Sequence, residues 1–271
     1  MEIKNPKYFI TTCCDEFQKF MLSSSMPKFE INIFDDTQYY LAQATMPLNE
    51  GEGYTLDVPR IWHSNSLKEI KTTLFHELTH IYDNFNLLSG FSNDERINRL
   101  SLYTEVNATR IQLMYDFNFE TINSSKIIKE QASFNVDVIL DTIRGEMSEL
   151  KKQNTVSSIS GGNPICSISD CIGYIFGSII FYIKHYNDGT HNYNKILVQI
   201  DDIIKFSTVK IFKKIQEMFI ESKTTSDDFE ELYKYTKELD LYLLSYFSDY
   251  NERTKRIKEI DDEIALLKGT L

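Results

Sequence analysis

The spacing of apolar residues changes along the chain from a helical period to a period of two, and then back. The opening segment places apolar residues on one helix face behind a proline that suits a first turn: Pro6, Phe9, Ile10, Cys13, Phe17 and Phe20. Phe29, Ile31 and Ile33 then alternate with polar residues, and two β-like runs follow, QYYLAQATM and GYTLDVPRIW. From Ser66 onward the pattern is helical almost to the end. This order predicts a predominantly helical α+β fold with a small N-terminal β-sheet.

Proline, glycine and serine mark the expected breaks. Pro59 lies inside a β-like run and predicts an edge strand or a bulge, because proline cannot donate to a strand ladder. TVSSISGG at 155–162, followed by Pro164, predicts a loop near 153–168. Helices are expected before this loop and again near 169–187, 192–221, 226–247 and 249–268.

Residues 76–80 read His-Glu-Leu-Thr-His within a helical stripe of Ile70, Leu74, Leu78, Ile81 and Phe85. Positions i and i+4 share a helix face, so His76 and His80 can direct their imidazoles at one Zn²⁺ ion, away from the stripe. Glu77 can reach a water molecule on that metal and take its proton. With five His in 271 residues, such a pair is expected by chance only about 0.1 times. We therefore predict a zinc site; the competing interpretation is a surface helix with two incidental histidines.

Catalytic zinc takes three protein ligands and leaves one position open. No HxxGxxH continuation follows the motif, so the third ligand is expected to be a carboxylate on the next helix. Glu105, in a helix starting near Asn98, is the predicted ligand, and Ala108 one turn later would allow the two helices to approach closely. The competing acids stand at cap or exit positions: Asp94, Glu95 and Asp116.

The two motifs HELTHIYD and TEVNATR resemble those of the gluzincin metallopeptidases, in which a glutamate from a downstream helix completes HExxH. More narrowly, they resemble the mitochondrial inner-membrane peptidases that process an ATP-synthase subunit (HELxHxxD, then SExRA), and their prokaryotic relatives, often encoded on mobile elements. The resemblance covers residues 50–117 and departs from the narrower pattern at Asn107, where that pattern has arginine. It implies that His76, His80 and Glu105 bind zinc, that Glu77 is the general base, and that residues 1–120 form a zincin-like core. The helical subdomain 121–271 has no counterpart in it.

The expected chemistry is peptide-bond hydrolysis, in which a zinc-bound water gives its proton to Glu77 and attacks the scissile carbonyl. The oxyanion also needs a donor, and the sequence leaves the choice open among Tyr103, Tyr115, His185 and His191. Asp83, one turn beyond His80, has two interpretations: an acceptor for the ring N–H of a ligand histidine, or an exposed helix acid. The run Tyr54 to Ile61 is expected to offer a sheet edge to an extended peptide.

Composition then excludes several classes. A net charge of −11 without a concentrated basic segment excludes nucleic acid as the expected partner. The N-terminal segment lacks an apolar stretch behind a basic start, and the four cysteines form no CxxC pair, so a cytoplasmic protein with reduced thiols is expected. The longest apolar run, Cys171 to Ile183, reaches about 20 Å as a helix, less than the roughly 30 Å of a bilayer core. It predicts a buried helix and no membrane span, with Gly173 and Gly177 allowing close packing.

The sequence as a whole predicts a zinc metalloendopeptidase that acts on a restricted protein or peptide substrate. Residues 121–271 exceed what the chemistry requires, and they are expected to select that substrate or to bind a protein partner through their helices. The alternative is a catalytically inactive or structural-zinc relative that serves as a protein- or peptide-binding module.

Overall fold

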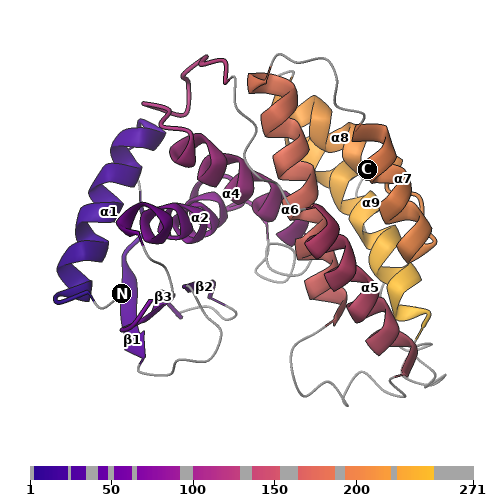
Figure 1. Cartoon of the computed structure of the whole chain (residues 1–271), viewed down its shortest axis with the longest axis horizontal. Helices are drawn as coiled ribbons and strands as arrows, with labels where there is room; N and C mark the ends of the chain where they lie inside the picture. Colours follow the sequence, from indigo (N-terminus) through magenta and orange to yellow (C-terminus); the bar gives the residue numbers. More distant parts are fainter. Residues whose placement is uncertain are drawn as a thin grey trace. The chain divides into compact units, whose positions relative to one another are not determined.

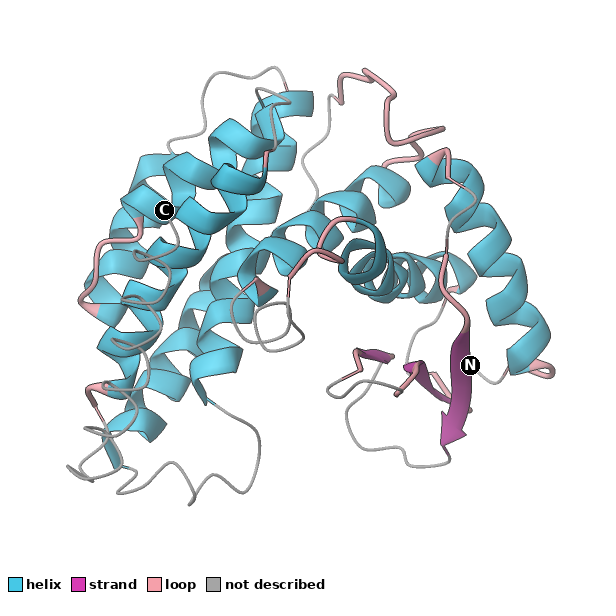
Figure 2. Cartoon of the chain, turned by 180° about the vertical axis from the view of Figure 1, so that it is seen from behind, coloured by secondary structure: helices cyan, strands magenta, loops and turns pink. Residues whose placement is uncertain are grey.

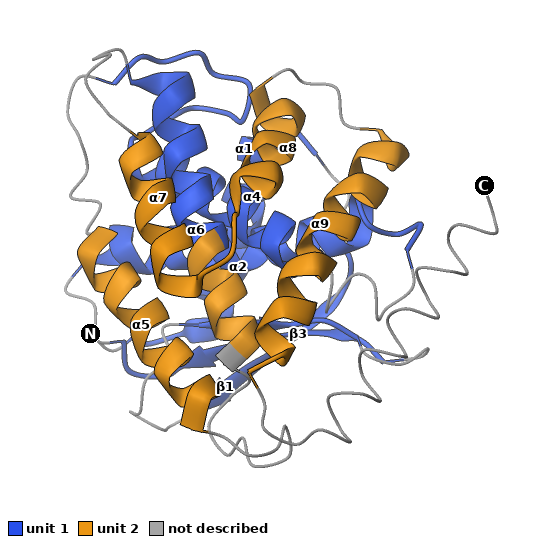
Figure 3. Ribbon diagram, turned by 90° about the vertical axis from the view of Figure 1, so that its right-hand side faces the viewer, with its two compact units in different colours: residues 1–134, 173–191 blue, residues 135–172, 192–271 orange. Residues whose placement is uncertain are grey.

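The computed structural model describes residues 3–23, 26–34, 42–47, 52–62, 66–91, 100–128, 136–152, 164–186, 193–220 and 225–246. The chain forms two compact units, shown in two colours in Figure 3: residues 1–134 with 173–191, and residues 135–172 with 192–271. The expected core of residues 1–120 lies within the first unit, which also takes in part of a later helix. Within the described residues the fold is predominantly helical with one small sheet, in agreement with the predicted α+β class (Figure 1).

The sheet has three strands in the order β1-β3-β2: β1 (Phe29–Phe34), β2 (Gln43–Thr45) and β3 (Tyr54–Pro59). The middle strand β3 pairs in parallel with β1 and antiparallel with β2. The expectation of an edge strand at Pro59 is therefore wrong. Proline is tolerated here because it is the last residue of β3, opposite Phe34, where the ladder ends. Leu56 and Val58 on β3 are fully buried.

The first unit contains helices α1 (Pro6–Met21), α2 (Leu67–Asn86) and α4 (Ser101–Asp116), and the three strands lie on one side of the α2–α4 pair (Figures 1 and 2). Pro6 is the first residue of α1, and the Asn5 side chain caps the helix. Both residue types favour a helix start at these positions. Phe17 and Phe20 of α1 pack edge-on against Phe75 of α2, with ring centroids 5.3 and 5.6 Å away. These contacts fix one side of α2.

Helix α2 carries the predicted motif, and its cap explains where it begins. Ser66 Oγ accepts from the backbone N–H of Glu69, the expected bond at a serine N-cap. Four residues of the predicted stripe are fully buried, but Phe85 is 42% exposed and its ring contacts Tyr54 instead, so that assignment is corrected. α4 begins at Ser101 rather than near Asn98, and its N-cap residue Leu100 provides no side-chain cap.

Helix α6 (Pro164–His185) belongs to both units, since the contact division falls between Ile172 and Gly173. It extends beyond the apolar run at both ends, so the expected length of the apolar helix is corrected. By length and composition, Ile165–His185 is one helix in the described part of the chain that could cross a membrane, and 72% of its most apolar window is buried within the protein. The predicted loop near 153–168 is shorter at its C-terminal end, because residues 164–168 are helical; residues 153–163 lie outside the described part.

The second unit contains α5 (Val136–Lys152), α7 (Tyr193–Ile204), α8 (Val209–Ile220) and α9 (Ser226–Leu244). The single helix expected over 192–221 is wrong, because the chain turns at Lys205, which has a φ of 60°. Asp201 stabilises this break: its Oδ1 accepts from both the backbone N–H and the hydroxyl of Thr208, at 2.8 and 2.7 Å. The helix expected at 249–268 lies outside the described residues.

Candidate metal centre

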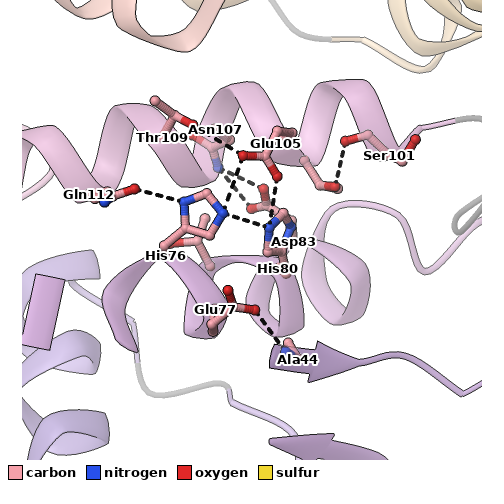
Figure 4. Close-up of polar contacts among 12 residues, drawn as sticks. Ala44, His76, Glu77, His80, Asp83, Ser101, Glu105, Asn107, Thr109 and Gln112 are labelled. Atoms are coloured by element: carbon pink, nitrogen blue, oxygen red, sulfur yellow. Dashed lines mark hydrogen bonds and ion pairs between the residues drawn. The ribbon is translucent and has the colours of Figure 1, made fainter. Parts of the chain in front are cut away.

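Helices α2 and α4 pack together and bring three predicted ligands to one point (Figure 4). His76 Nε2 lies 3.3 Å from Glu105 Oε1, and His80 Nε2 lies 3.3 Å from Glu105 Oε2. The two Nε2 atoms are 3.1 Å apart. All three side chains are mostly buried, with 13 to 17% of their surface exposed. Glu105, twenty-five positions after His80, therefore shares one small space with the two histidines of α2.

The separations of these atoms test whether the residues fit zinc. Zinc–nitrogen and zinc–oxygen bonds of about 2.0 to 2.1 Å in tetrahedral geometry place neighbouring ligand atoms about 3.3 to 3.4 Å apart. The two Nε2 atoms are 3.1 Å apart, and each lies 3.3 Å from a different oxygen of Glu105, which is close to this value for each pair. One ligand atom from each of the three residues lies within 4.8 Å of the other two. Two imidazoles and one carboxylate are also a donor set that zinc accepts at catalytic sites. The types of donor atom and their closeness therefore fit a zinc ion.

The same closeness shifts the proton equilibria of the side chains. Burial disfavours a protonated imidazole, but the charge and hydrogen bond of Glu105 outweigh burial and raise the pKa of His76 to about 9. Burial alone would raise the pKa of Glu105, yet the adjacent His76 and His80 hold it well below its usual range. The ionised carboxylate of Glu105 thus favours a positive charge beside it, either on a histidine or on a bound cation.

Contacts around the ligands hold them in place. His76 Nδ1 lies 2.9 Å from Gln112 Oε1. Since this oxygen only accepts, Nδ1 is the donor, and Nε2 is the ring nitrogen that faces the cluster. Thr109 Oγ1 donates to Glu105 Oε1 at 3.4 Å. Sequence reasoning missed both residues. Gln112 lies two turns beyond Glu105, and that spacing was the available signal, because it places the two side chains on one face of α4.

Helix α6 closes the far side of Glu105. A Cβ atom added at Gly173 would lie 2.8 and 2.9 Å from Cβ and Cγ of Glu105, and one added at Gly177 would lie 2.5 Å from the carbonyl oxygen of Val106. Only glycine permits this approach of α6 to α4. The small-residue pair expected to allow close packing therefore packs on the helix that carries Glu105.

Glu77, the residue after His76, faces the sheet. Its Oε2 accepts a hydrogen bond from the backbone N–H of Ala44 on β2, with an N···O distance of 2.7 Å (Figure 4). Glu77 is neither buried nor fully exposed. The edge strand beside the site is thus β2, and not the run from Tyr54, which forms the middle of the sheet.

Asp83 is fully buried, so its interpretation as an exposed acid is wrong. Both carboxylate oxygens accept from Asn107 Nδ2, at 2.9 and 2.8 Å, and Asn107 Oδ1 accepts from Arg110 at 2.8 Å. Burial raises the pKa of Asp83 to about 7, although the bond from Asn107 and the charges of His80 and Arg110 oppose the shift. The chain therefore links Asp83 to an arginine through Asn107, the residue at which it departs from the narrower family pattern.

The other candidates lie elsewhere or outside the described residues. Asp116, a competing ligand, pairs with Lys68 at 3.3 Å, while Asp94, Glu95, His63 and His191 are outside the described part. Of the oxyanion candidates, Tyr115 stacks on Phe75 and Tyr103 is buried beside Asp83 and Arg110. His185 packs against Phe119 and Phe181, with its Nδ1 3.2 Å from the carbonyl oxygen of Lys126. These contacts give Tyr115 and His185 packing partners away from the cluster.

Comparison with protein-family models, with curated proteins and with solved structures finds no match to this chain. The resemblance to gluzincins thus remains a prediction, carried by the two motifs.

Proposed function

We propose that this protein is a zinc-dependent metallopeptidase with a zincin-like core. The observation that carries the proposal is the cluster of His76, His80 and Glu105, in which one ligand atom from each residue lies within 4.8 Å of the other two. A further carboxylate, that of Glu77, follows His76 directly in the sequence and is not one of these ligands. A structural zinc site closes the coordination sphere with four protein ligands, whereas a hydrolytic site uses three and keeps one position open. In the described part of the chain the cluster has three ligands, with Glu77 next to one of them, and this favours the hydrolytic kind.

In this proposal each residue has one task. His76, His80 and Glu105 hold the metal, and Gln112 keeps His76 in the tautomer that binds. A bound zinc ion would polarise the scissile carbonyl and lower the pKa of a water molecule towards about 7. Glu77 takes a proton from the attacking water and gives it to the leaving amine, which is general base and then general acid catalysis.

The substrate we propose is a protein segment in extended conformation. β2 is the edge strand next to Glu77, and an exposed strand edge can bind a peptide as a further strand. The helices of the second unit, which contribute no ligand in the described residues, are the proposed source of selectivity for a restricted substrate or partner.

Metal analysis of three purified proteins tests the site. We expect near-stoichiometric zinc in the wild type and in Glu77→Gln, and a strong loss in His80→Ala, because only the last removes a ligand. Glu105→Ala is expected to weaken binding as well. Full zinc retention in His80→Ala would show that the predicted site is wrong.

Activity is tested separately on a library of peptides and on denatured protein. We expect cleavage by the wild type that stops with chelator and returns with zinc, and a loss of at least about 100-fold in Glu77→Gln at unchanged zinc content. Zinc binding with no cleavage by any of these proteins would instead support the binding-module alternative.

A further inference from the structure

The contact between Glu77 and the sheet has a defined geometry. Ala44 lies opposite Leu56 in the antiparallel β2–β3 pair, and its N–H donates to Glu77 Oε2 at 2.7 Å. In such a pair the N–H and C=O of one residue point to the same side, either toward the partner strand or away from it. Because the amide of Ala44 meets Glu77, a side chain of α2, it faces away from β3. Removing the N–H of Ala44 would therefore leave the hydrogen bonds between β2 and β3 intact.

A hydrogen bond to a charged oxygen restricts a flexible side chain. Glutamate has three rotatable bonds, and an unrestrained one distributes over several rotamers. A short N–H···O⁻ bond selects the rotamers that satisfy it and occupies one of the two carboxylate oxygens. Figure 4 shows Glu77 extending toward Ala44 on the side of α2 that faces the sheet, while His76 and His80 point toward α4.

We propose that the backbone amide of Ala44 is a positioning group for the general base. It holds Oε2 of Glu77 and leaves Oε1 as the atom that takes the proton from water. β2 thus sets the orientation of the base through the N–H of Ala44, and the carbonyl of Ala44, which points to the same side, is left to accept from a substrate strand. The inference has two parts. That Ala44 orients the Glu77 carboxylate rests on the hydrogen bond itself, and that this orientation serves catalysis rests on the proposed function.

The structural part is tested without any activity measurement. Amide hydrogen exchange by NMR is compared between the wild type and Glu77→Ala, which removes the acceptor. We expect exchange at Ala44 to become at least about tenfold faster in the variant, while Thr45, whose amide faces β3 by the same alternation, stays unchanged. Equal exchange at Ala44 in both proteins would overturn the proposal.

The catalytic part is tested with two substitutions at one position. Ala44→Pro removes the N–H, and an edge strand tolerates proline where the N–H lies outside the ladder. Ala44→Ser keeps the N–H and is the conservative variant. We expect kcat of Ala44→Pro to fall on the order of tenfold below that of Ala44→Ser, with similar KM and similar zinc content. A loss in KM alone, or equal kcat in the two variants, would overturn the positioning role.

The two arms separate this inference from the peptidase proposal. A wild type that shows no Glu77-dependent cleavage contradicts the peptidase proposal, and with it the catalytic role of Ala44. Unchanged exchange at Ala44 contradicts the positioning contact alone, whatever the activity. Should Ala44→Pro fail to fold, as judged by circular dichroism, the exchange measurement on Glu77→Ala still decides whether Ala44 holds the carboxylate.

Discussion

At the scale of single residues, the tautomer of His76 depends on one amide side chain. Gln112 Oε1 accepts from His76 Nδ1 at 2.9 Å, which leaves Nε2 free to bind a metal. Gln112→Ala removes this acceptor, and we expect zinc affinity to fall by about 10- to 100-fold, measured by competition with a chromophoric chelator. Gln112→Glu keeps an acceptor and is expected to retain most of the affinity. Equal affinities for the Ala and Glu variants would contradict the assignment.

A second residue-scale prediction concerns stability at low pH. Burial lowers the pKa of His185 to about 4, and the charges of Lys184 and Arg110 act in the same direction, while the bond to the Lys126 carbonyl opposes them. An unfolded histidine titrates near 6.5, so between about pH 4 and 6.5 the unfolded state binds more protons than the folded state. The contribution of the neutral His185 to the free energy of unfolding is therefore complete above about pH 6.5, and it is lost as the pH falls to about 4.

His185→Gln removes the titrating group and keeps a donor for the Lys126 carbonyl. We expect the free energy of unfolding of the wild type to fall relative to this variant by up to roughly 3 kcal/mol between pH 6.5 and 4. Urea unfolding in the presence of chelator, which removes any contribution from bound metal, provides the measurement. Parallel curves for the two proteins would show that His185 titrates normally in the folded state.

The sequence could bring His76 and His80 together because the helical period alone determines which residues share a face. Glu105 needed a second step, the packing of two helices. It was chosen because Ala108 follows it by one turn and because the competing acids stand at cap or exit positions. Gln112 and Ala44 could not be chosen in this way. Each meets its partner only through tertiary packing, and neither a glutamine nor an alanine in a strand carries a local pattern that indicates a role.

At the scale of elements, the approach of α6 to α4 predicts different effects at two glycines. A methyl group at Gly177 meets the Val106 carbonyl oxygen at 2.5 Å, a backbone atom that cannot rotate away, so Gly177→Ala is expected to destabilise the fold by about 1 to 3 kcal/mol. A methyl group at Gly173 meets the Glu105 side chain, so Gly173→Ala is expected chiefly to reduce zinc affinity. Thermal unfolding and metal competition measure the two effects.

Gly145 on α5 provides the matched control. Nothing lies within 4 Å of a Cβ added there, and the residue is exposed. Gly145→Ala is therefore expected to stabilise the protein by about 0.5 to 1 kcal/mol, the ordinary gain of alanine over glycine in a helix. If Gly177→Ala were stabilising as well, the close packing of α6 on α4 would be contradicted.

Element boundaries show where sequence patterns stop being sufficient. Helices α2 and α4 could be expected from the sequence because caps and apolar periodicity act locally. The cap that Ser66 provides at the start of α2 is an example. The break between α7 and α8 was missed because apolar periodicity continues across it. The turn depends on the positive φ of Lys205 and on the hydrogen bond from Thr208 to Asp201. No glycine or proline stands there in the sequence to indicate a turn. Pro59 was misplaced for a related reason, since its effect depends on whether the ladder continues beyond it.

At the scale of the whole molecule, zinc is expected to stabilise the two compact units unequally. A ligand that binds only the folded site adds about RT ln(1 + [L]/Kd) to the free energy of any opening that destroys the site, or about 2.7 kcal/mol at one hundred times Kd. The site lies entirely in the first unit, on α2 and α4, with the C-terminal part of α6 packed on Glu105. Openings confined to the second unit leave all three ligands in place, so zinc does not oppose them.

Hydrogen exchange with and without zinc measures this difference. We expect amides of α2, α4 and residues 173–185 to exchange more slowly by up to about 100-fold with saturating zinc, and amides of α8 and α9 to be unaffected. His80→Ala, which lacks a ligand, should show no zinc effect in any helix. Equal slowing in α8 and α9 would mean that the two units open together, and no slowing in α4 would remove Glu105 from the ligand set. The pattern thus tests the site and the division of the chain in one experiment, because each helix reports whether its own opening requires the metal to leave.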